Sequence, residues 1–313
     1  MTGYDLIGDI HGYADELEAL LQKMDYREIG DVYRHNNRKA IFIGDLIDRG
    51  PKQRRVLEIV QKMVGDGGAK IVMGNHEYNA VCFHTVDSSG APLRAHTEKN
   101  IGQHAAFLEE FPFGEEETKQ VIDWFKTLPI ALDLDGVRVV HACWSDQHID
   151  CLHQGHHGAM YLDEQSLLSS SEKGTDLYDV VEALLKGIEV ELPSHHSFLD
   201  KDNNERRSIR IEWWNQNART YREYSALYDE VKQNIPDVPI TQSHSVSDND
   251  HRSPVFFGHY WMRGEPSILT DQAVCLDYSI AASRGERKLV AYRWNPKSAI
   301  EESNFVSVKR YNP

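Results

Sequence analysis

The sequence is poor in cysteine, contains no long apolar run and carries fewer basic than acidic residues. No C-x-x-C pair is present, and the four cysteines are scattered at Cys82, Cys143, Cys151 and Cys275. This usage predicts reduced thiols and a cytoplasmic protein. No stretch approaches the roughly 18 to 20 apolar residues of a membrane span, and a first strand that starts near Tyr4 leaves no room for a signal peptide. We therefore expect no membrane partner.

The scarcity of basic side chains bears on the choice of partner. The 313 residues include 34 lysines and arginines against 49 aspartates and glutamates, which gives a formal net charge of -15 at pH 7. An acidic surface disfavours binding to phosphate backbones, so nucleic acid is not expected as a partner. The 40% hydrophobic share still allows a sizeable core. Nothing in the sequence specifies an oligomeric state.

Three short apolar runs each end in a glycine that is followed by polar side chains. Each run is typical of a buried strand, and open α/β sheets place ligands at the C-terminal ends of such strands. One isolated Asp-x-x-Asp-Arg is more often a turn with a surface ion pair, but three polar clusters at strand ends predict a metal site. After residues 4–7, 40–43 and 70–73 come Gly8-Asp9-Ile10-His11-Gly12, Gly44-Asp45-Leu46-Ile47-Asp48-Arg49-Gly50-Pro51 and Gly74-Asn75-His76-Glu77.

The segments between these runs have helical periodicity. Residues 14–24 and 54–64 carry apolar side chains at helical spacing. The order strand, helix, strand, helix, strand favours right-handed crossovers in a parallel or mixed sheet, with the three polar clusters on one edge. Further strands are predicted at 129–134 and 137–140, joined by an Asp135-Gly136 turn, and at 254–258, 273–277 and 288–294.

The three motifs resemble those of calcineurin-like metallophosphoesterases, and more narrowly those of the phosphoprotein phosphatase branch, which includes bacterial serine/threonine protein phosphatases. The remaining metal histidines of that branch match His141 in Val139-Val140-His141-Ala142 and His259 in Phe257-Gly258-His259-Tyr260. The resemblance covers roughly residues 3–143 and 254–294. It implies an α/β fold with central mixed β-sheets, arranged as a two-layered sandwich flanked by helices, in a single domain over residues 1–313.

The resemblance also implies a centre of two divalent metal ions that share Asp45. The mixture of carboxylate, amide and imidazole groups suits Mn²⁺, Fe or Zn²⁺ better than Ca²⁺, and we expect Mn²⁺ first. No cysteine or serine nucleophile is then needed, because a metal-bound water or hydroxide attacks phosphorus directly. The implied ligands are Asp9, His11 and Asp45 for one ion, and Asp45, Asn75, His141 and His259 for the other.

Three further residues are candidates for catalysis. His76 follows the implied ligand Asn75 and suits a general acid that protonates the leaving oxygen, while Asp48 orients its ring and stabilises its charged form. Arg49 is a candidate substrate-binding residue, because its planar guanidinium can bind two phosphate oxygens. In the alternative interpretation, His76, Asp48 and Arg49 form only a structural ion-pair network.

Two features separate the chain from other branches of the superfamily. Many of its phosphodiesterases end in Gly-His-x-His, but Trp261 replaces the last histidine here. Diadenosine tetraphosphate hydrolases commonly lack an acid at the place of Asp48. We therefore expect hydrolysis of phosphomonoesters, on phosphoproteins or small phosphate esters. The alternative substrates are diadenosine tetraphosphate or another small phosphorylated metabolite. A catalytically silent scaffold would have lost ligands or His76, and neither is seen.

Residues 145–253 differ in character from the rest, and we expect a largely helical cap inserted beside the metal site. Helical spacing of apolar residues predicts helices over 176–189 and 221–231. The histidine-rich stretch 148–157 fits no standard zinc spacing. In the phosphoprotein phosphatase branch, a second phosphate-binding arginine usually lies between the last two metal histidines, and a solvated basic patch is the alternative. The candidates are Arg206, Arg207 and Arg210.

Overall fold

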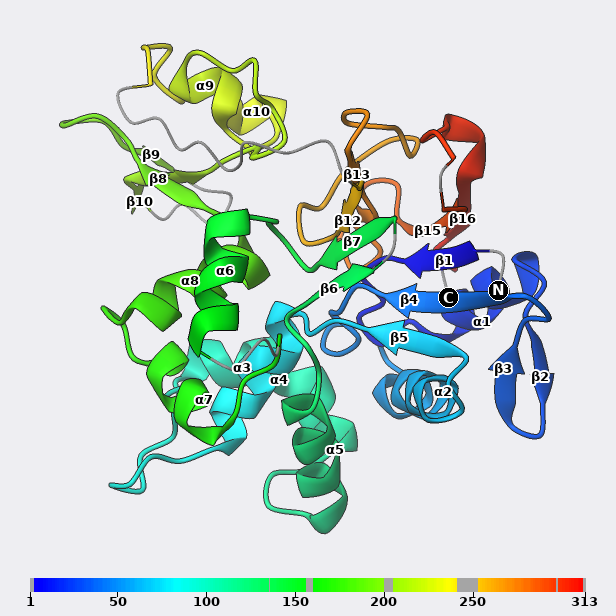
Figure 1. Ribbon diagram of the computed structural model, residues 1–313. Helices are drawn as coiled ribbons and strands as arrows, with labels where there is room; N and C mark the ends of the chain where they lie inside the picture. Colours follow the sequence, from blue (N-terminus) through cyan, green and yellow to red (C-terminus); the bar gives the residue numbers. More distant parts are fainter. Residues whose placement is uncertain are drawn as a thin grey trace.

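Two β-sheets form the centre of the molecule (Figure 1). The structure is a computed structural model that describes residues 3–134, 136–155, 160–199, 205–240, 253–296 and 298–311. The first sheet has the order β14-β15-β1-β4-β5, with β16 beside β15, and the second has the order β13-β12-β7-β6. Their strands are β1 (Gly3–Ile7), β4 (Arg38–Phe42), β5 (Ala69–Ile71), β6 (Ala131–Leu134), β7 (Val137–Val140), β12 (Val255–Phe257), β13 (Ala273–Cys275), β14 (Asp277–Tyr278), β15 (Lys288–Trp294) and β16 (Phe305–Lys309).

The direction of the strands brings the predicted motifs to one edge. Strands β1, β4 and β5 are parallel to one another, and β12 is parallel to both β7 and β13. The hairpin of β6 and β7 is antiparallel, as its Asp135-Gly136 turn predicts, although Asp135 itself lies outside the described residues. The C-terminal ends of the parallel strands therefore carry the glycine motifs of both sheets. The predicted α/β sandwich is confirmed.

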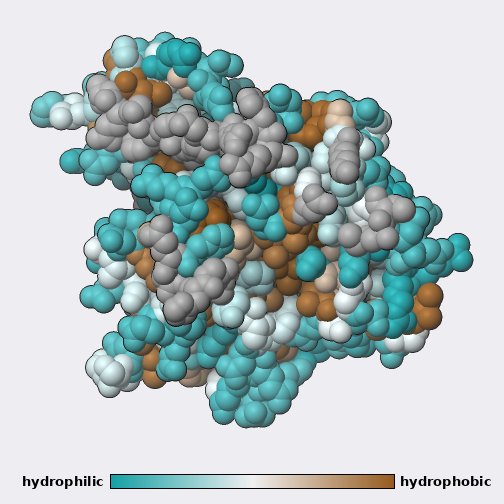
Figure 2. Space-filling view, viewed as in Figure 1, coloured by the Kyte–Doolittle hydropathy of each residue, from teal (hydrophilic) through white to brown (hydrophobic). Residues whose placement is uncertain are grey.

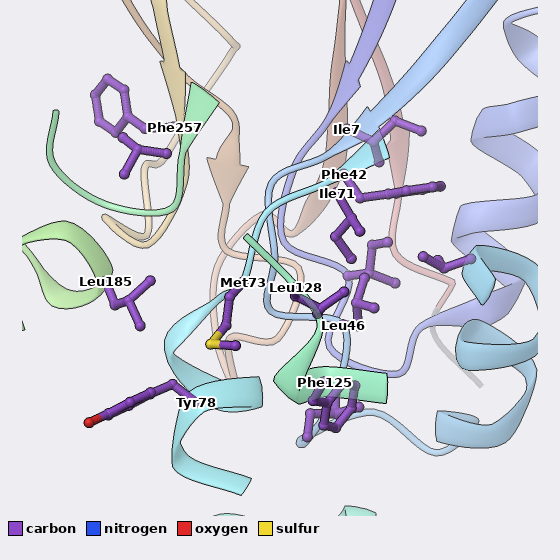
Figure 3. Close-up of a cluster of buried hydrophobic side chains, with 14 of the residues drawn as sticks. Ile7, Phe42, Leu46, Ile71, Met73, Tyr78, Phe125, Leu128, Leu185 and Phe257 are labelled. Atoms are coloured by element: carbon purple, nitrogen blue, oxygen red, sulfur yellow. The ribbon is translucent and has the colours of Figure 1, made fainter. Parts of the chain in front are cut away.

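Alternating side chains divide the core into two layers. Leu6, Ile41 and Val72 of the first sheet share one apolar cluster with Val139, Phe256 and other residues of the second sheet. Their neighbours in sequence point to the opposite face, because successive side chains of a strand alternate. Figure 3 shows Ile7, Phe42 and Ile71 in this outer layer, in the cluster that also contains Leu46 and Leu128.

Helices cover the outer faces of the sheets. The helices α1 (Ala14–Lys23) and α2 (Gln53–Gly65) confirm the two predicted from periodicity, each within one residue, and pack against strands of the first sheet. After β5 come α3 (Asn75–His84), α4 (Glu98–Glu110) and α5 (Glu116–Lys126). Helix α3 packs on α5, and α2 packs on α4. This packing places α4 near the sheet edge that carries the polar motifs, where α3 begins.

The segment after β7 forms a further layer with its own small core. It contains α6 (Asp146–Gly155), α7 (Glu164–Ser171) and α8 (Asp176–Lys186), so the helical expectation holds up to Lys186. A cluster that includes Val190, Ile209 and Tyr221 is separate from the main core. The elements of this second part are β8 (Glu189–Glu191), β9 (Phe198–Leu199), β10 (Glu205–Arg206), β11 (Ser208–Arg210), α9 (Tyr221–Tyr224) and α10 (Asp229–Lys232).

Several elements differ from the prediction. The helix predicted over 176–189 ends at Lys186, because the following Gly187 takes φ of 81° and ψ of 161°, a non-helical backbone conformation that glycine adopts readily. The helix predicted over 221–231 is instead the two short helices α9 and α10, separated by residues 225–228. The hairpin of β2 (Arg27–Ile29) and β3 (Val32–Arg34), the strand β16 and the 3-10 helix η1 (Glu302–Asn304) were not predicted.

The surface accords with the composition. Hydrophilic residues cover most of the face shown in Figure 2, while hydrophobic ones gather near its centre. Among the described residues, no helix combines the length and the apolar character that crossing a membrane requires.

Candidate metal centre

The six predicted ligands meet where strands of the two sheets end. Asp9 and His11 lie in the loop after β1, and Asp45 follows β4. Asn75 is the first residue of α3, just after β5. From the second sheet, His141 follows β7 directly and His259 lies two residues after β12. The structure thus brings all six together, and each is at least partly buried.

Asp45 lies between two groups of donor atoms. Its Oδ2 is 3.5 Å from Nε2 of His11, and its Oδ1 is 3.3 Å from Nε2 of His141. The same nitrogen of His141 is 3.2 Å from Oδ1 of Asn75. In two groups the donor atoms lie within 4.8 Å of one another: His11, Asp45 and His76, and Asp45, His141 and His259. Asp45 is the member that they share, as a bridging carboxylate would be.

Three buried polar atoms of the candidate ligands lack hydrogen-bond partners. Oδ1 of Asp9, Nε2 of His11 and Nε2 of His259 are buried and unpaired. Buried polar atoms are normally hydrogen-bonded, so each exception needs an explanation. The lone pairs of a carboxylate oxygen and of imidazole nitrogens are the groups that bind a divalent cation. The residues present therefore fit a pair of metal ions.

Hydrogen bonds on the far side of two rings set which nitrogen faces the centre. Nδ1 of His11 donates to the carbonyl oxygen of Ile47 at 2.9 Å, and Nδ1 of His141 donates to that of Ile43 at 2.7 Å. In the neutral form of each ring Nδ1 therefore carries the proton, and Nε2 has the lone pair for a ligand. Metal-binding histidines commonly have this second hydrogen bond.

The electrostatics hold the imidazoles of His11 and His259 neutral, whereas for His141 burial is outweighed by the carboxylate of Asp45, which raises the pKa of that ring to about 10. Burial lowers the pKa of His11 to about 4 and holds that of His259 well below its usual value. Burial alone would raise the pKa of Asp45, but His141 and His76 outweigh it and hold the pKa well below its ordinary range. Burial, together with the carboxylate of Asp277, raises the pKa of Asp9. A cation bound to Asp9 would stabilise its charged form and so lower this pKa.

The loops that carry the centre have an unusual backbone. Left-handed φ values are rare outside glycine and cost of order 1–3 kcal/mol each. They persist where surrounding structure imposes them, as at functional sites. A Cβ atom at Gly74 would overlap the backbone nitrogen of Asp45, and one at Gly258 would overlap Oδ1 of Asp9, which explains two of the glycines. In these loops the non-glycine residues with φ between 49° and 78° are His11, Asp45, Asp48, Arg49, His259 and Trp261.

His76 belongs to a chain of hydrogen bonds through Asp48. Nδ1 of His76 donates to one carboxylate oxygen of Asp48 at 2.6 Å, and Nδ1 of His104 donates to the other at 2.9 Å. Burial would raise the pKa of Asp48, but the bonds from His104 and His76 outweigh it and lower the pKa to about 2. His104, on α4, was not predicted from the sequence. Asp48 is thus held as a carboxylate by two rings.

A cavity of about 190 Å³ opens beside these groups. Asp45, Asn75 and His259 line it together with His76, Arg49 and Trp261. Arg49 is exposed, and within the described chain its guanidinium has no hydrogen-bond or ion-pair partner. The ring of Trp261 is 6.4 Å from that of His11. The cavity is therefore lined both by candidate metal ligands and by the guanidinium of Arg49, which has no ion-pair partner in the described chain.

The comparison with protein families settles the membership of the chain. The model of the family described as calcineurin-like phosphoesterase matches residues 4–238. The chain belongs to this family. The bis(5'-nucleosyl)-tetraphosphatase [asymmetrical] of Bacillus subtilis is 45% identical over 130 residues, which are 41% of this chain and 51% of that protein. The one from Oceanobacillus iheyensis is 44% identical over 73 residues, 23% of this chain and 29% of that protein. The chain thus spans about half or less of these relatives.

Solved structures of two phosphatases share the fold of this chain. A cold-active protein-tyrosine phosphatase of a Shewanella species aligns with a TM-score of 0.52 at 15% identity, over 95% of this chain and 81% of that one. A protein serine/threonine phosphatase from Saccharomyces cerevisiae also reaches 0.52 at 10% identity, over 100% of this chain and 80% of that one. At this identity the likeness concerns the fold alone.

Of the three arginine candidates for a second phosphate-binding group, Arg210 is partly buried and acts electrostatically on the candidate ligand His259. After burial, its charge is the largest contribution that lowers the pKa of His259. Arg206 and Arg207 are exposed, and Arg207 pairs with Glu205 at 3.7 Å. None of the three lines the cavity beside Asp45.

No metal group involves the histidine-rich stretch among its described residues. Nδ1 of His148 is 2.7 Å from the hydroxyl oxygen of Ser145. Within the part of the chain that the structure covers, both groups of metal-binding side chains include Asp45. His156 and His157 of this stretch lie outside the described residues.

Glu77 holds two of the motif loops together through hydrogen bonds, a role that was not predicted from the sequence. Its carboxylate accepts the backbone N–H groups of Asp45, Leu46 and Gly74 at 2.8, 2.8 and 2.9 Å. The side chain is fully buried. It therefore ties the loop after β4 to the start of α3, and so fixes the position of Asp45 relative to Asn75.

Glu77→Ala should destabilise the fold, because it leaves three buried N–H groups without an acceptor. We expect a loss of about 3 kcal/mol or more in the free energy of unfolding. Urea unfolding of the metal-free protein measures it without a contribution from bound ions. Glu58→Ala, which removes an exposed carboxylate from α2, is the control and should change stability far less. A loss for Glu77→Ala no larger than that of the control would contradict this role.

Proposed function

We propose that the chain hydrolyses phosphate monoesters with the help of two divalent metal ions. The observation that carries the proposal is the position of Asp45, which is shared by two groups of closely spaced donors next to unpaired buried atoms. One ion would be held by Asp9, His11 and Asp45. The other would be held by Asp45, Asn75, His141 and His259. When bound, such a pair lowers the pKa of water and neutralises charge on the phosphoryl group.

His76 is the proposed general acid. Its Nδ1 proton is engaged by Asp48, so Nε2 is the atom that can deliver a proton into the cavity. Burial would lower the pKa of His76, but the carboxylates of Asp45 and Asp48 outweigh it and raise the pKa above its ordinary value. These two carboxylates favour the protonated ring, which is the form that can protonate a leaving oxygen.

Arg49 is the proposed phosphate-binding residue. Its exposed guanidinium lines the cavity beside Asp45 and has no partner within the described chain. A planar guanidinium can donate two parallel hydrogen bonds to phosphate oxygens. Binding in this way would fix the phosphoryl group against the centre and leave the leaving oxygen on the side of His76.

Residues 145–253 are proposed as a cap inserted in the single domain 1–313. The indole N–H of Trp213 donates to the carbonyl oxygen of Ala142 at 3.0 Å, next to the ligand His141. The hydroxyl of Tyr228 donates to the carbonyl oxygen of Trp261 at 3.0 Å, in the loop of His259. The insertion thus contacts both loops that bring ligands from the second sheet. The described cysteines are all free, which accords with the proposed cytoplasmic location.

Removal of metal tests the proposed reaction. Turnover of p-nitrophenyl phosphate should require Mn²⁺, disappear after chelation and return when Mn²⁺ is restored. Parallel assays with Fe²⁺ and Zn²⁺ identify the preferred metal. Turnover that survives complete chelation, or no turnover with any of these metals, would contradict the proposal. Elemental analysis of the same samples relates activity to the number of bound ions.

Hydrolysis of dinucleoside tetraphosphates is the second candidate. It is favoured by the names of the relatives, which are bis(5'-nucleosyl)-tetraphosphatases at 43 to 46% identity over parts of the chain. Asp48 favours the first candidate, since this acid is commonly absent from such hydrolases. Rates on a phosphoserine peptide and on diadenosine tetraphosphate, measured side by side with Mn²⁺, distinguish the two.

A further inference from the structure

Arg94 is a second arginine in the cavity that has no carboxylate partner. Its Nη1 donates to Oδ1 of Asn79 and its Nη2 donates to Oε1 of Gln103, each at 2.8 Å. Both acceptors are neutral amides. In the described part of the chain, no ion pair neutralises this guanidinium. Most other described arginines of this acidic protein pair with aspartate or glutamate, as Arg34 does with Asp66 at 2.6 Å.

Partial burial of the Arg94 guanidinium without an ion-pair partner costs free energy of folding. The side chain is half-buried, so its charge has lost part of its hydration; burial lowers its pKa, although Cys82, Asp48 and Glu182 act in the opposite direction. A charge that loses water without gaining a counter-ion destabilises the fold unless a ligand supplies the opposite charge. The two amides orient the guanidinium, and the carboxylates of Asp48 and Glu182 act on its charge without forming an ion pair with it in the described chain. This arrangement is typical of an arginine that binds an anionic ligand.

The position of Arg94 relates it to the metal centre. Asn79 lies one helical turn after the candidate ligand Asn75 on α3, which is roughly 6 Å along the helix axis. Gln103 lies on α4, directly before His104, which holds Asp48. The same two helices therefore set the places of the candidate acid and of Arg94. Arg94, Arg49 and Asp45 line one cavity.

We propose that Arg94 binds a second phosphate group of the substrate, one that is linked to the phosphate being hydrolysed. Arg49 already offers one guanidinium to the phosphoryl group at the centre, and Arg94, held by Asn79 one helical turn beyond Asn75, adds another to the same cavity. The preferred substrates would then carry two or more linked phosphates. This inference rests on the metal-dependent hydrolysis proposed above, and within it Arg94 favours the second candidate class of substrate, which carries linked phosphates.

The size of the cavity favours a linked phosphate chain over an acidic phosphopeptide. Its volume of about 190 Å³ is below the range of roughly 300 to 1,000 Å³ typical of pockets that enclose drug-sized ligands. A peptide would have to reach Arg94 with a side chain from outside the cavity. Linked phosphates are compact and bring their charges close together. Asn100, which also lines the cavity, adds a neutral polar group beside Arg94.

The test compares Arg94→Gln with Arg49→Gln in the full-length, Mn²⁺-loaded protein. The measured quantity is kcat/KM for diadenosine tetraphosphate divided by kcat/KM for p-nitrophenyl phosphate. Arg94→Gln should lower this ratio by about tenfold or more, because it removes a charge-assisted hydrogen bond to the second phosphate only. Arg49→Gln should reduce both activities and change the ratio much less. Arg94→Lys should restore part of the ratio, and Arg34→Gln is the surface control.

A binding measurement keeps the inference separate from the proposed function. Calorimetry at saturating Mn²⁺ gives the affinities for inorganic tripolyphosphate and inorganic phosphate. Arg94→Gln should weaken tripolyphosphate about tenfold more than phosphate, even if the wild-type protein hydrolyses neither test substrate. Equal losses for both anions would mean that Arg94 binds the hydrolysed phosphate itself or only supports the fold, and either result would overturn the inference. A loss confined to a phosphoserine peptide with acidic neighbours would overturn it as well.

Discussion

Replacement of His76 by asparagine should lower kcat by about 10²- to 10⁴-fold while both metal ions stay bound. Asparagine can still donate a hydrogen bond to Asp48 from its amide, so the local structure is retained. What it lacks is a titratable proton to give to the leaving oxygen. His196→Asn, on the exposed surface of the insertion, is a matched control that should leave activity unchanged.

The leaving group provides the sharper test of this role. A general acid matters more when the leaving oxygen is more basic, so His76→Asn should lose more activity on phenyl phosphate than on p-nitrophenyl phosphate. An equal loss on both esters, with two ions still bound, would exclude proton transfer by His76.

The metal content of the His76→Asn variant shows whether His76 is a general acid or a metal ligand. Nε2 of His76 lies 4.0 Å from Oδ2 of Asp45, and these side chains form one group with His11. The geometry alone therefore admits His76 as a metal ligand. Elemental analysis of His76→Asn decides the matter, since loss of one ion would make His76 a ligand, and retention of both supports the acid.

The sequence predicted the motif loops well because their signals are local. A short apolar run that ends in glycine and a polar residue marks a strand end, and parallel strands carry such ends to one edge of a sheet. Six candidate ligands could therefore be placed together from residues as distant as Asp9 and His259, and the structure brings them together.

The residues that support these loops were not predictable in the same way. His104 reaches Asp48 from a helix that begins more than 40 residues later in the chain, and no pattern in that helix marks it. Glu77 belongs to a quoted motif, but only the fold shows that its carboxylate accepts three N–H groups of two loops. Contacts of this kind depend on tertiary packing, which periodicity does not report.

Periodicity failed where tertiary contacts override local preference. The tyrosines of residues 221–231 have helical spacing, yet Tyr221 donates its backbone N–H to Val238, and Ser225 pairs with Ile211. These bonds divide the segment into α9 and α10. Strand β16 was missed because all but one of its side chains are partly buried, so its alternation is weak.

Asp45→Asn should leave fewer than two ions bound and reduce activity by about 10²- to 10³-fold or more, since metal ions supply several kcal/mol of transition-state stabilisation. Asparagine keeps the oxygen that accepts the backbone N–H of His76 at 3.0 Å, so the loop should remain in place. It removes the negative charge that a bridging ligand contributes to both ions.

Comparison with Asp9→Asn makes the bridging role testable. Asp9 is proposed to hold one ion only, so its replacement should reduce manganese content toward one ion per chain, whereas Asp45→Asn should weaken both sites. Asp66→Asn, which removes a surface carboxylate paired with Arg34, is the control and should keep two ions. If Asp45→Asn retained both ions, or lost no more than Asp9→Asn does, Asp45 would not bridge, and its place between His11 and His141 would need another explanation.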